Sequence, residues 1–222
     1  MDNMKLWHSV AKTDPRHVKP ITGKSYRGNS PAPYWIIQRA TEEFGPIGIG
    51  WGVIVKNERF ERLSDTDVLH VATVSVWYML NGVRSETFDQ MGGTKAAYMT
   101  KAGGMVIDED AGKKSVTDAM VKCMSMIGFA GDIFSGRWDD SKYVEQVGQE
   151  FVEKEREAAR QLWLDDTAMA LEKCETREEL ESTWKDAKGV MKKEEDGDAY
   201  ETLKPIMERV AAAIKAKNEA AT

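Results

Sequence analysis

Residues 68–91 read VLHVATVSVWYMLNGVRSETFDQM, an Asn-Gly pair flanked by two runs of β-prone side chains. The first run, Val68–Leu80, is dominated by branched and aromatic residues, which are enriched in strands. Asn81-Gly82 is the preferred pair of a type I′ turn, because both central positions of that turn need a positive φ. The stretch therefore predicts a β-hairpin in which Val68–Leu80 pairs with Val83–Met91.

The segments before the hairpin predict one more strand and a helix. Apolar residues recur at every second position in Ile47–Phe60, the period of a half-buried strand. Together with the hairpin, this strand predicts a three-stranded antiparallel meander. Tyr34–Phe44 has helical spacing, and the Gly-Pro pair that follows would end the helix. The chain up to about Pro33 is rich in Pro, Gly, Ser and Lys, which predicts an irregular arm.

After the hairpin the pattern changes from strand to helix. Gly92–Asp110 carries two glycine pairs and predicts a mobile connection. Ala111–Gly128 predicts a helix that ends at Gly128. Its expected apolar stripe consists of Val116, Ala119 or Met120, Cys123 and Ile127. Asp132–Tyr143 predicts a loop, because it mixes polar residues with isolated aromatics.

Beyond about Val144 the composition shifts to Glu, Lys, Ala and Met, which favour helices. A capping-box pattern at Thr176-Arg-Glu-Glu supports the start of one of them. The four expected helices are Glu145–Leu164, Asp166–Lys173, Thr176–Lys188 and Ala199–Lys217. The sequence therefore predicts an α+β fold, with a β-β-β-α core over residues 1–145 and an acidic helical region over residues 146–222.

Composition narrows the class of protein. Hydrophobic residues make up 41% of the chain and charged residues 31%, which is typical of a globular protein. The apolar runs are too short to span a bilayer, and the first ten residues lack the pattern of a secretory signal. Two cysteines, Cys123 and Cys174, are too few for a disulfide framework or a zinc site. A cytoplasmic location is the expectation that follows.

The net charge of −6 is unevenly distributed. Residues 1–150 carry 18 basic and 19 acidic residues, whereas residues 151–222 carry 13 and 18. Within Met1–Ala40, seven basic residues stand against two acidic ones. The asymmetry is compatible with a DNA-binding front and an acidic rear, although a run of charge is more often a solvated face.

Motifs for catalysis are weak. Gly23-Lys24-Ser25 resembles the end of a phosphate-binding loop, but the glycine needed five positions earlier is replaced by Val18. The three histidines are scattered and suggest neither a metal cluster nor a triad. The acidic run 108–110 could bind a divalent ion, but it is explained as well by a helix entry. The sequence thus predicts no catalytic residue, no metal and no cofactor.

Lysines on the helix expected at Ala111–Gly128 suggest a phosphate-binding face. Lys114, Asp118 and Lys122 recur at i, i+4 and i+8, so they lie on one side of that helix. Asp118 could hold both lysines while their outer edges contact phosphate oxygens. An ordinary exposed ladder of ion pairs explains the same spacing.

Aromatic residues interleave with the basic ones and could stack on bases. Tyr98 is the candidate expected to be exposed, because small and polar neighbours surround it and Lys95 and Lys101 flank it. For most other aromatics, including Tyr34, Trp35 and Trp138, a place in the core explains the sequence equally well.

Three blocks between Tyr34 and Tyr143 resemble the single-strand annealing superfamily, which includes the eukaryotic ring-forming recombination mediator and phage annealing proteins of the Erf and Sak kind. The first is YWIIQRATEEFG at 34–45 with Gly50-Trp51 after it. The second is the hairpin 70–93, which ends in a glycine pair. The third, and most specific, is GKKSVTD at 112–118 with Lys122 and Gly128.

This resemblance implies a β-β-β-α core that assembles into rings or filaments and holds single-stranded DNA in a basic groove with its bases exposed. Lys113 and Lys122 match backbone-contacting positions of the superfamily, and Lys101 falls near another. Val121 and Ser125 depart from its basic row, so the path of the DNA on this chain differs or is weaker. A compact chain of this kind suits a phage or prophage.

The resulting prediction is a non-enzymatic protein that binds single-stranded DNA and anneals complementary strands in recombination and repair, as a homo-oligomer in a bacterial cytoplasm. A phage adaptor that recruits a host replication or repair partner is the alternative, and a metal nuclease using Asp108, Asp110 and Asp139 is a third reading. A host single-strand-binding protein or a phage exonuclease is the expected protein partner, and no membrane is expected. The predicted DNA-binding residues are Lys24, Arg27, Lys95, Tyr98, Lys101, Lys113, Lys114 and Lys122.

Overall fold

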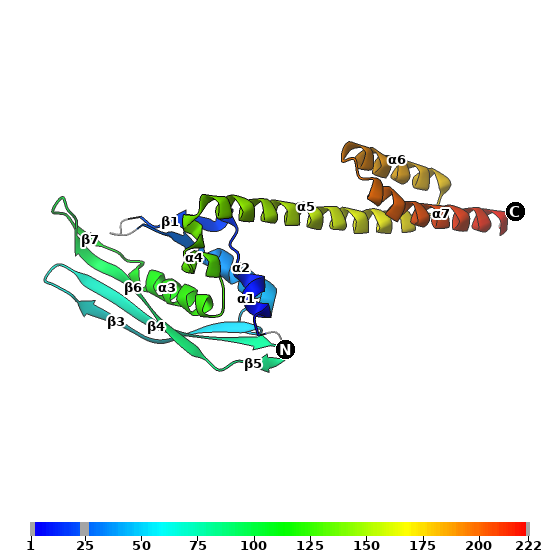
Figure 1. The fold of residues 1–222 in the computed structure, drawn as a ribbon. Coiled ribbons are helices and arrows are strands. Elements are labelled where there is room, and N and C mark those ends of the chain that lie inside the picture. Colours follow the sequence, from blue (N-terminus) through cyan, green and yellow to red (C-terminus); the bar gives the residue numbers. More distant parts are fainter. Residues whose placement is uncertain (1–2, 23–26, 221–222) are drawn as a thin grey trace. The chain divides into compact units, whose positions relative to one another are not determined.

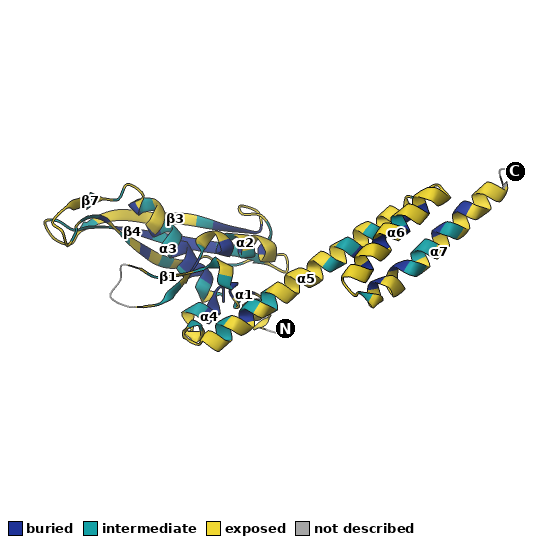
Figure 2. Ribbon diagram, turned by 90° about the horizontal axis from the view of Figure 1, so that it is seen from above, coloured by how far each residue is buried: buried dark blue, intermediate teal, exposed yellow. Residues whose placement is uncertain are grey.

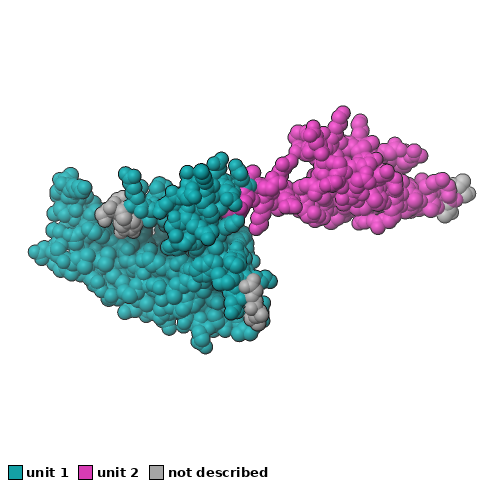
Figure 3. Space-filling view, in the orientation of Figure 1, with its two compact units in different colours: residues 1–149 teal, residues 150–222 magenta. Residues whose placement is uncertain are grey.

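The computed structural model describes residues 3–22 and 27–220. The chain divides into two compact units, Met1–Gln149 and Glu150–Thr222, drawn in teal and magenta in Figure 3. The fold is α+β, with an antiparallel sheet and its helices in the first unit and, over residues 150–220, only helices in the second. No helix in the described part of the chain has the length and apolar character needed to cross a bilayer.

A curled antiparallel sheet forms the centre of the first unit (Figure 1). The two long strands that follow the helix at 33–44 pair over most of their length, and a β-bulge between Val55 and Asn57 interrupts their register. In sheet order the strands are β3 (Trp51–Arg62), β4 (Val68–Leu80), β6 (Phe88–Met99) and β7 (Met105–Ile107), and β5 (Val83–Arg84) pairs with the end of β4. The predicted meander is therefore confirmed, with one additional strand at its edge.

The hairpin turn has the predicted geometry. Asn81 has a φ of 51° and Gly82 a φ of 78°, so both central residues are left-handed as a type I′ turn requires. The strand expected over Val83–Met91 is interrupted, however, because β5 ends at Arg84. After Arg84, a side-chain hydrogen bond takes the place of backbone pairing with β4: the Ser85 hydroxyl accepts from the Tyr78 amide at 3.0 Å.

The connection predicted over Gly92–Asp110 is wrong, since this segment holds most of β6 and all of β7. Gly92 lies here in a strand that a helix approaches closely, and not in a loop. A Cβ added to Gly92 would lie 2.5 Å from the Ala119 nitrogen and closer still to the Ser115 carbonyl oxygen. Only glycine allows the following helix to pack directly on this strand.

That helix, α3 (Ala111–Met126), lies across one face of the sheet (Figures 1 and 2). Its end is as predicted, because Gly128 follows the C-cap with a φ of 105°. The apolar stripe is shifted: Val116 and Ile127 are only half-buried. The buried positions are Ala111, Ser115, Ala119, Met120, Val121, Cys123 and Met124. The difference arises because small residues face the sheet, which brings α3 close to β6.

The N-terminal arm is not irregular. The described part contains α1 (Lys5–Val10), a 3-10 turn η1 (Pro15–His17) and a small hairpin of β1 (Val18–Pro20) and β2 (Asn29–Pro31). The buried carboxylate of Asp132 fixes this segment, accepting hydrogen bonds from the Thr13 amide at 2.8 Å and the Thr13 hydroxyl at 2.7 Å. A distant acidic partner of this kind leaves no local pattern in the sequence.

Further helical segments of the first unit lie at residues 33–44 and after residue 130. The predicted helix at Tyr34–Phe44 is confirmed as α2 (Pro33–Phe44). The loop expected at Asp132–Tyr143 instead contains α4 (Gly131–Phe134), the 3-10 turn η2 (Arg137–Asp139) and the start of α5 (Ser141–Glu172).

The second unit is built from the part of α5 that begins at Glu150, from α6 (Arg177–Lys193) and from α7 (Gly197–Ala220). The two helices expected on either side of residue 165 are one continuous helix, because the acidic pair there is exposed rather than capping. The capping box is confirmed, with Thr176 accepting from the Glu179 amide. One face of each helix is buried (Figure 2). The shared core comprises Leu164, Leu171, Leu180, Trp184, Ala187, Met191, Ala199, Leu203, Val210 and Ile214.

Candidate nucleic-acid interface

The predicted DNA-binding residues that the structure describes come from four parts of the first unit. Lys113, Lys114 and Lys122 lie on α3, Lys95 and Tyr98 lie on β6, and Lys101 lies in the turn between β6 and β7. Arg27 is exposed just before β2, and Lys24 lies outside the described residues. The α3 and β6 residues are neighbours along the β6–β7 side of the sheet, because α3 packs on β6.

These cations do not share one face of the sheet. Gly92 points toward α3, and side chains alternate along a strand, so Lys95 points to the opposite face. The α3 lysines lie on the helix side of the same edge. The arrangement is therefore a set of cations on both sides of the β6–β7 edge, and not the single basic row that the spacing on α3 suggested.

Lys122 and Asp118 form an ion pair of 2.8 Å that also contacts the backbone of β6. Lys122 donates to the Met91 carbonyl oxygen at 3.3 Å, and Asp118 accepts from the Gly93 amide at 3.3 Å. Beyond its short pairing with β7, this edge of β6 has no strand partner in the described part of the chain. We call Lys122 and Asp118 the edge pair, since together they satisfy two backbone groups of an open strand edge.

Lys114 is not held by Asp118, contrary to the prediction. Its ammonium group contacts both carboxylate oxygens of Asp108, at 2.9 and 2.7 Å. This contact lowers the pKa of Asp108 and raises that of Lys114. Lys113 is more loosely paired, 3.7 Å from Asp110, and its side chain is 78% exposed. The acidic run at 108–110 therefore neutralises the two lysines that open α3.

Lys95 and Tyr98 interact with each other on β6. The Lys95 ammonium lies 5.5 Å from the centre of the Tyr98 ring and 2.9 Å from the Asp67 carboxylate. The hydrogen bond from Lys95 lowers the pKa of Asp67. Tyr98 is half-buried rather than exposed, so the prediction of an open stacking platform is wrong. A base could reach only part of its ring.

Further exposed cations lie at the end of the sheet where β3 meets β4 and β6 meets β7. Lys101 occupies the β6–β7 turn, and Arg62 ends β3 beside the β3–β4 turn. Figure 1 shows both turns at the same end of the sheet. Sequence reasoning missed Arg62, although a cation directly before a predicted turn is a usable signal. Lys19, exposed on β1, is counted in the basic N-terminal segment but is not one of the predicted DNA-binding residues.

Groups suited to metal or covalent chemistry are separated. Among residues 3–22 and 27–220, no three His, Cys, Asp or Glu side chains come together in a way that could hold a metal ion. Cys123 lies on the buried face of α3 against the sheet, and burial raises the pKa of its thiol to about 11. A thiol of this kind stays protonated at neutral pH and is a poor nucleophile.

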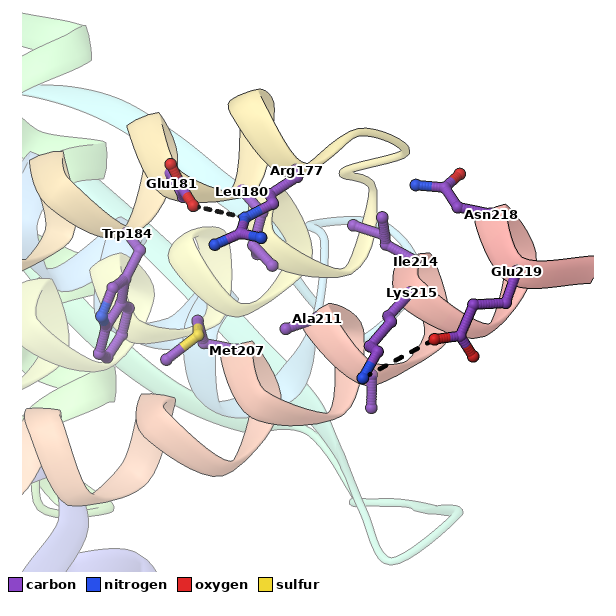
Figure 4. A pocket seen from close by; sticks show the side chains of 11 residues that line it. Arg177, Leu180, Glu181, Trp184, Met207, Ala211, Ile214, Lys215, Asn218 and Glu219 are labelled. Atoms are coloured by element: carbon purple, nitrogen blue, oxygen red, sulfur yellow. Dashed lines mark hydrogen bonds and ion pairs between the residues drawn. The ribbon is translucent and has the colours of Figure 1, made fainter. Parts of the chain in front are cut away.

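The second unit contains an apolar groove of about 650 Å³ between α6 and α7 (Figure 4). The side chains that converge on it are Leu180, Trp184, Met207, Ala211 and Ile214. Ion pairs flank it on both sides, Arg177 with Glu181 at 2.7 Å and Lys215 with Glu219 at 3.7 Å. The floor of the groove is apolar, and the charged side chains beside it neutralise one another in pairs. Such a groove is better suited to a protein segment than to a nucleic acid.

Neither a scan against protein-family models nor a search of curated proteins gave a match to this chain.

Proposed function

We propose that this protein binds single-stranded DNA and anneals complementary strands without ATP, as a homo-oligomer. The observation that supports it best is the β6–β7 edge of a β-β-β-α framework, which carries cations from α3, β6 and the β6–β7 turn on its two sides. On this proposal the phosphate backbone follows that edge and contacts Lys95, Lys101, Lys114 and Lys122. On the same proposal, the protein acts in recombination or repair in the cytoplasm of a bacterial host.

Most of these lysines already have a carboxylate partner, and this shapes the proposed binding. An exposed ion pair contributes only about 0–1 kcal/mol, so a phosphate can replace the aspartate at little cost. The residues 1–149 carry 18 basic and 18 acidic side chains, so no net positive charge attracts DNA from a distance. Binding by exchange of ion pairs should therefore be of moderate affinity and should weaken steeply with salt.

Self-association is proposed to use the other edge of the sheet. Strand β3 is 12 residues long and pairs only with β4 among the described strands. Its exposed apolar residues include Ile54 (40%), Val55 (46%) and Phe60 (68%). A long open edge of this kind is a template for pairing with another chain. A second copy added at β3 leaves the β6–β7 edge free for DNA.

The test is a strand-annealing assay with two complementary oligonucleotides and no nucleotide triphosphate. Annealing should be faster than the spontaneous rate, and the gain should decline as salt is raised. If the rate stays at the spontaneous value over a wide range of protein concentrations, the proposal fails. Degradation of the oligonucleotides in the presence of magnesium would instead favour the hypothesis of a metal nuclease.

An adaptor role is the second candidate, and the apolar groove between α6 and α7 favours it. In that role the first unit only oligomerises, and the second recruits a host single-strand-binding protein or a phage exonuclease. The annealing assay separates the two candidates, because an adaptor alone would not accelerate strand pairing.

A further inference from the structure

A second groove of the helical unit lies between α5 and the end of α6, and continues along the turn that leads into α7. Its volume is about 630 Å³. The α5 side runs from Glu153 to Trp163, a stretch of eleven residues that corresponds to about 15 Å of helix. The groove is therefore long enough for about three turns of an added helix.

Its floor is apolar. Trp163 is half-buried, Val190 is 39% exposed and Met191 is buried, and all three line the groove. Among the large apolar side chains of α6, only Val190 is exposed to solvent. Covering this floor would bury apolar surface, the main source of affinity in helix-in-groove recognition.

Its rim is strongly acidic. Six carboxylates line it against two guanidinium groups, those of Arg156 and Arg160. Arg160 forms a bidentate ion pair with Asp196, and its Nη2 donates to one carboxylate oxygen at 2.9 Å. The six carboxylates are Glu153, Glu157, Glu194, Glu195, Asp196 and Asp198. Residues 150–222 as a whole carry 13 basic and 19 acidic side chains, so the groove lies on the acidic unit of the chain.

The turn that carries part of this rim has an unusual backbone. Glu195 has a φ of 53°, a left-handed conformation that glycine or asparagine usually provides after a helix. The Asp196 amide donates to the Met191 carbonyl oxygen at 2.9 Å, which closes the end of α6 in this conformation. A glutamate here adds a carboxylate to the rim at a position where glycine would be less strained.

We propose that this groove binds a basic amphipathic helix of another protein, with apolar residues on the floor and Lys or Arg side chains against the rim. The carboxylates exclude a nucleic acid as occupant. A second copy of the same unit is disfavoured, since each copy carries a net charge of −6 over residues 150–222. A metal ion is not indicated, because the described carboxylates form no cluster of three that could hold one.

The experiment uses the full chain and a fluorescent 18-residue helical peptide made of Leu and Lys, titrated by anisotropy. A peptide of the same pattern with Glu in place of Lys serves as the opposite-charge probe. The groove variant is Glu153→Gln with Glu157→Gln. The control variant, Glu201→Gln with Glu208→Gln, makes the same change in net charge on exposed positions of α7 that do not line this groove.

The basic peptide should bind, and the groove variant should weaken it about fivefold, since two exposed ion pairs are lost. The control should change the affinity by less than half of that, and Val190→Ser should weaken binding without any change in charge. Equal effects of the groove and control variants, equal binding of the acidic peptide, or no binding of the basic peptide would each overturn the proposal. Strand annealing by the groove variant should equal that of the unchanged protein, so this result is independent of the proposed DNA function.

Discussion

Lys122 and Asp118, one turn apart on α3, are bound to each other and also to successive outward backbone groups of β6. The ammonium donates to the Met91 carbonyl oxygen, and the carboxylate accepts from the Gly93 amide. The pair thus has a structural role at the sheet edge before any ligand is considered. If DNA follows this edge, the same lysine must be shared between the strand and a phosphate.

Replacing Lys122 by Ala should therefore affect both DNA binding and stability. We expect weaker single-strand binding, with a salt slope lower by about one for the lost phosphate contact. The free energy of unfolding should fall by about 1 kcal/mol, because the Met91 carbonyl oxygen loses a charged donor. Fluorescence titrations at several salt concentrations measure the first effect and urea unfolding the second. Lys142→Ala, at an exposed lysine on α5, is the control. An unchanged slope for Lys122→Ala would remove this lysine from the DNA path.

The close approach of α3 to β6 makes a sharper prediction about stability. Gly92→Ala would place a methyl group against the Ser115 carbonyl and the Ala119 amide, so we expect a loss of about 3 kcal/mol. In Gly93→Ala the new methyl group would have no neighbour nearer than 3.7 Å, and the change should stay within about 1 kcal/mol. Thermal and urea unfolding of the two variants give the comparison. Equal stability would show that α3 does not pack on β6 in this way.

The contrast between these two glycines also shows where sequence reasoning reached its limit. A pair of glycines has the same appearance in a loop and in a strand crossed by a helix, so the predicted strand ends at Met91, the fourth of the twelve residues of β6. The Asn-Gly turn was predictable because its requirement is local: both residues need positive φ. The same holds for the capping box at Thr176, whose two partners are three residues apart.

The candidate site was predictable only in part, for a related reason. The i, i+4, i+8 spacing predicts that Lys114, Asp118 and Lys122 lie on one side of α3, and this part of the prediction is correct. It could not show that Lys114 turns back to Asp108, since that contact depends on where β7 delivers the chain to the helix. Nor could it show that Lys95 points to the opposite face of the sheet, which follows from the register of β6 against β4.

The proposed self-association makes a prediction for the open edge of β3. A lysine in place of Val55 puts a charge on the edge, a common way in which proteins prevent edge-to-edge pairing. We expect a smaller assembly with little change in the melting temperature, measured by light scattering after size exclusion. Val152→Lys, at a 61% exposed position on α5, should leave the assembly unchanged. If both variants keep the full assembly size, β3 is not the contact between copies.

Tyr143 makes a prediction about pH. Burial, with the nearby Asp132 carboxylate, raises the pKa of Tyr143 to about 12. The unfolded value is about 10, so the folded state retains this proton more tightly than the unfolded state. The stabilisation is therefore complete below about pH 10 and is lost as the pH rises toward 12. Denaturant unfolding at pH 9, 10 and 11 should show this decline, and Tyr143→Phe should reduce it. An identical decline in both proteins would assign it to other groups.

The division of labour between the two units can be tested by truncation. Val147 is only 1% exposed, so a cut before it would open the first unit, whereas a chain ending at Gln149 keeps every residue of that unit. We expect residues 1–149 to remain folded, to associate and to bind single-stranded DNA. Affinity should equal or exceed that of the full chain, because the removed part carries the whole net charge of −6.

The complementary piece, residues 150–222, has its own apolar core of ten buried side chains. It should fold as a helical bundle and show no affinity for the oligonucleotide, because its surface is acidic. Circular dichroism checks the folding of both pieces, and one oligonucleotide titration compares them with the full chain. A folded, associated first unit without DNA binding, or DNA binding by residues 150–222, would place the nucleic-acid site outside the β6–β7 edge and contradict the proposed function of that surface.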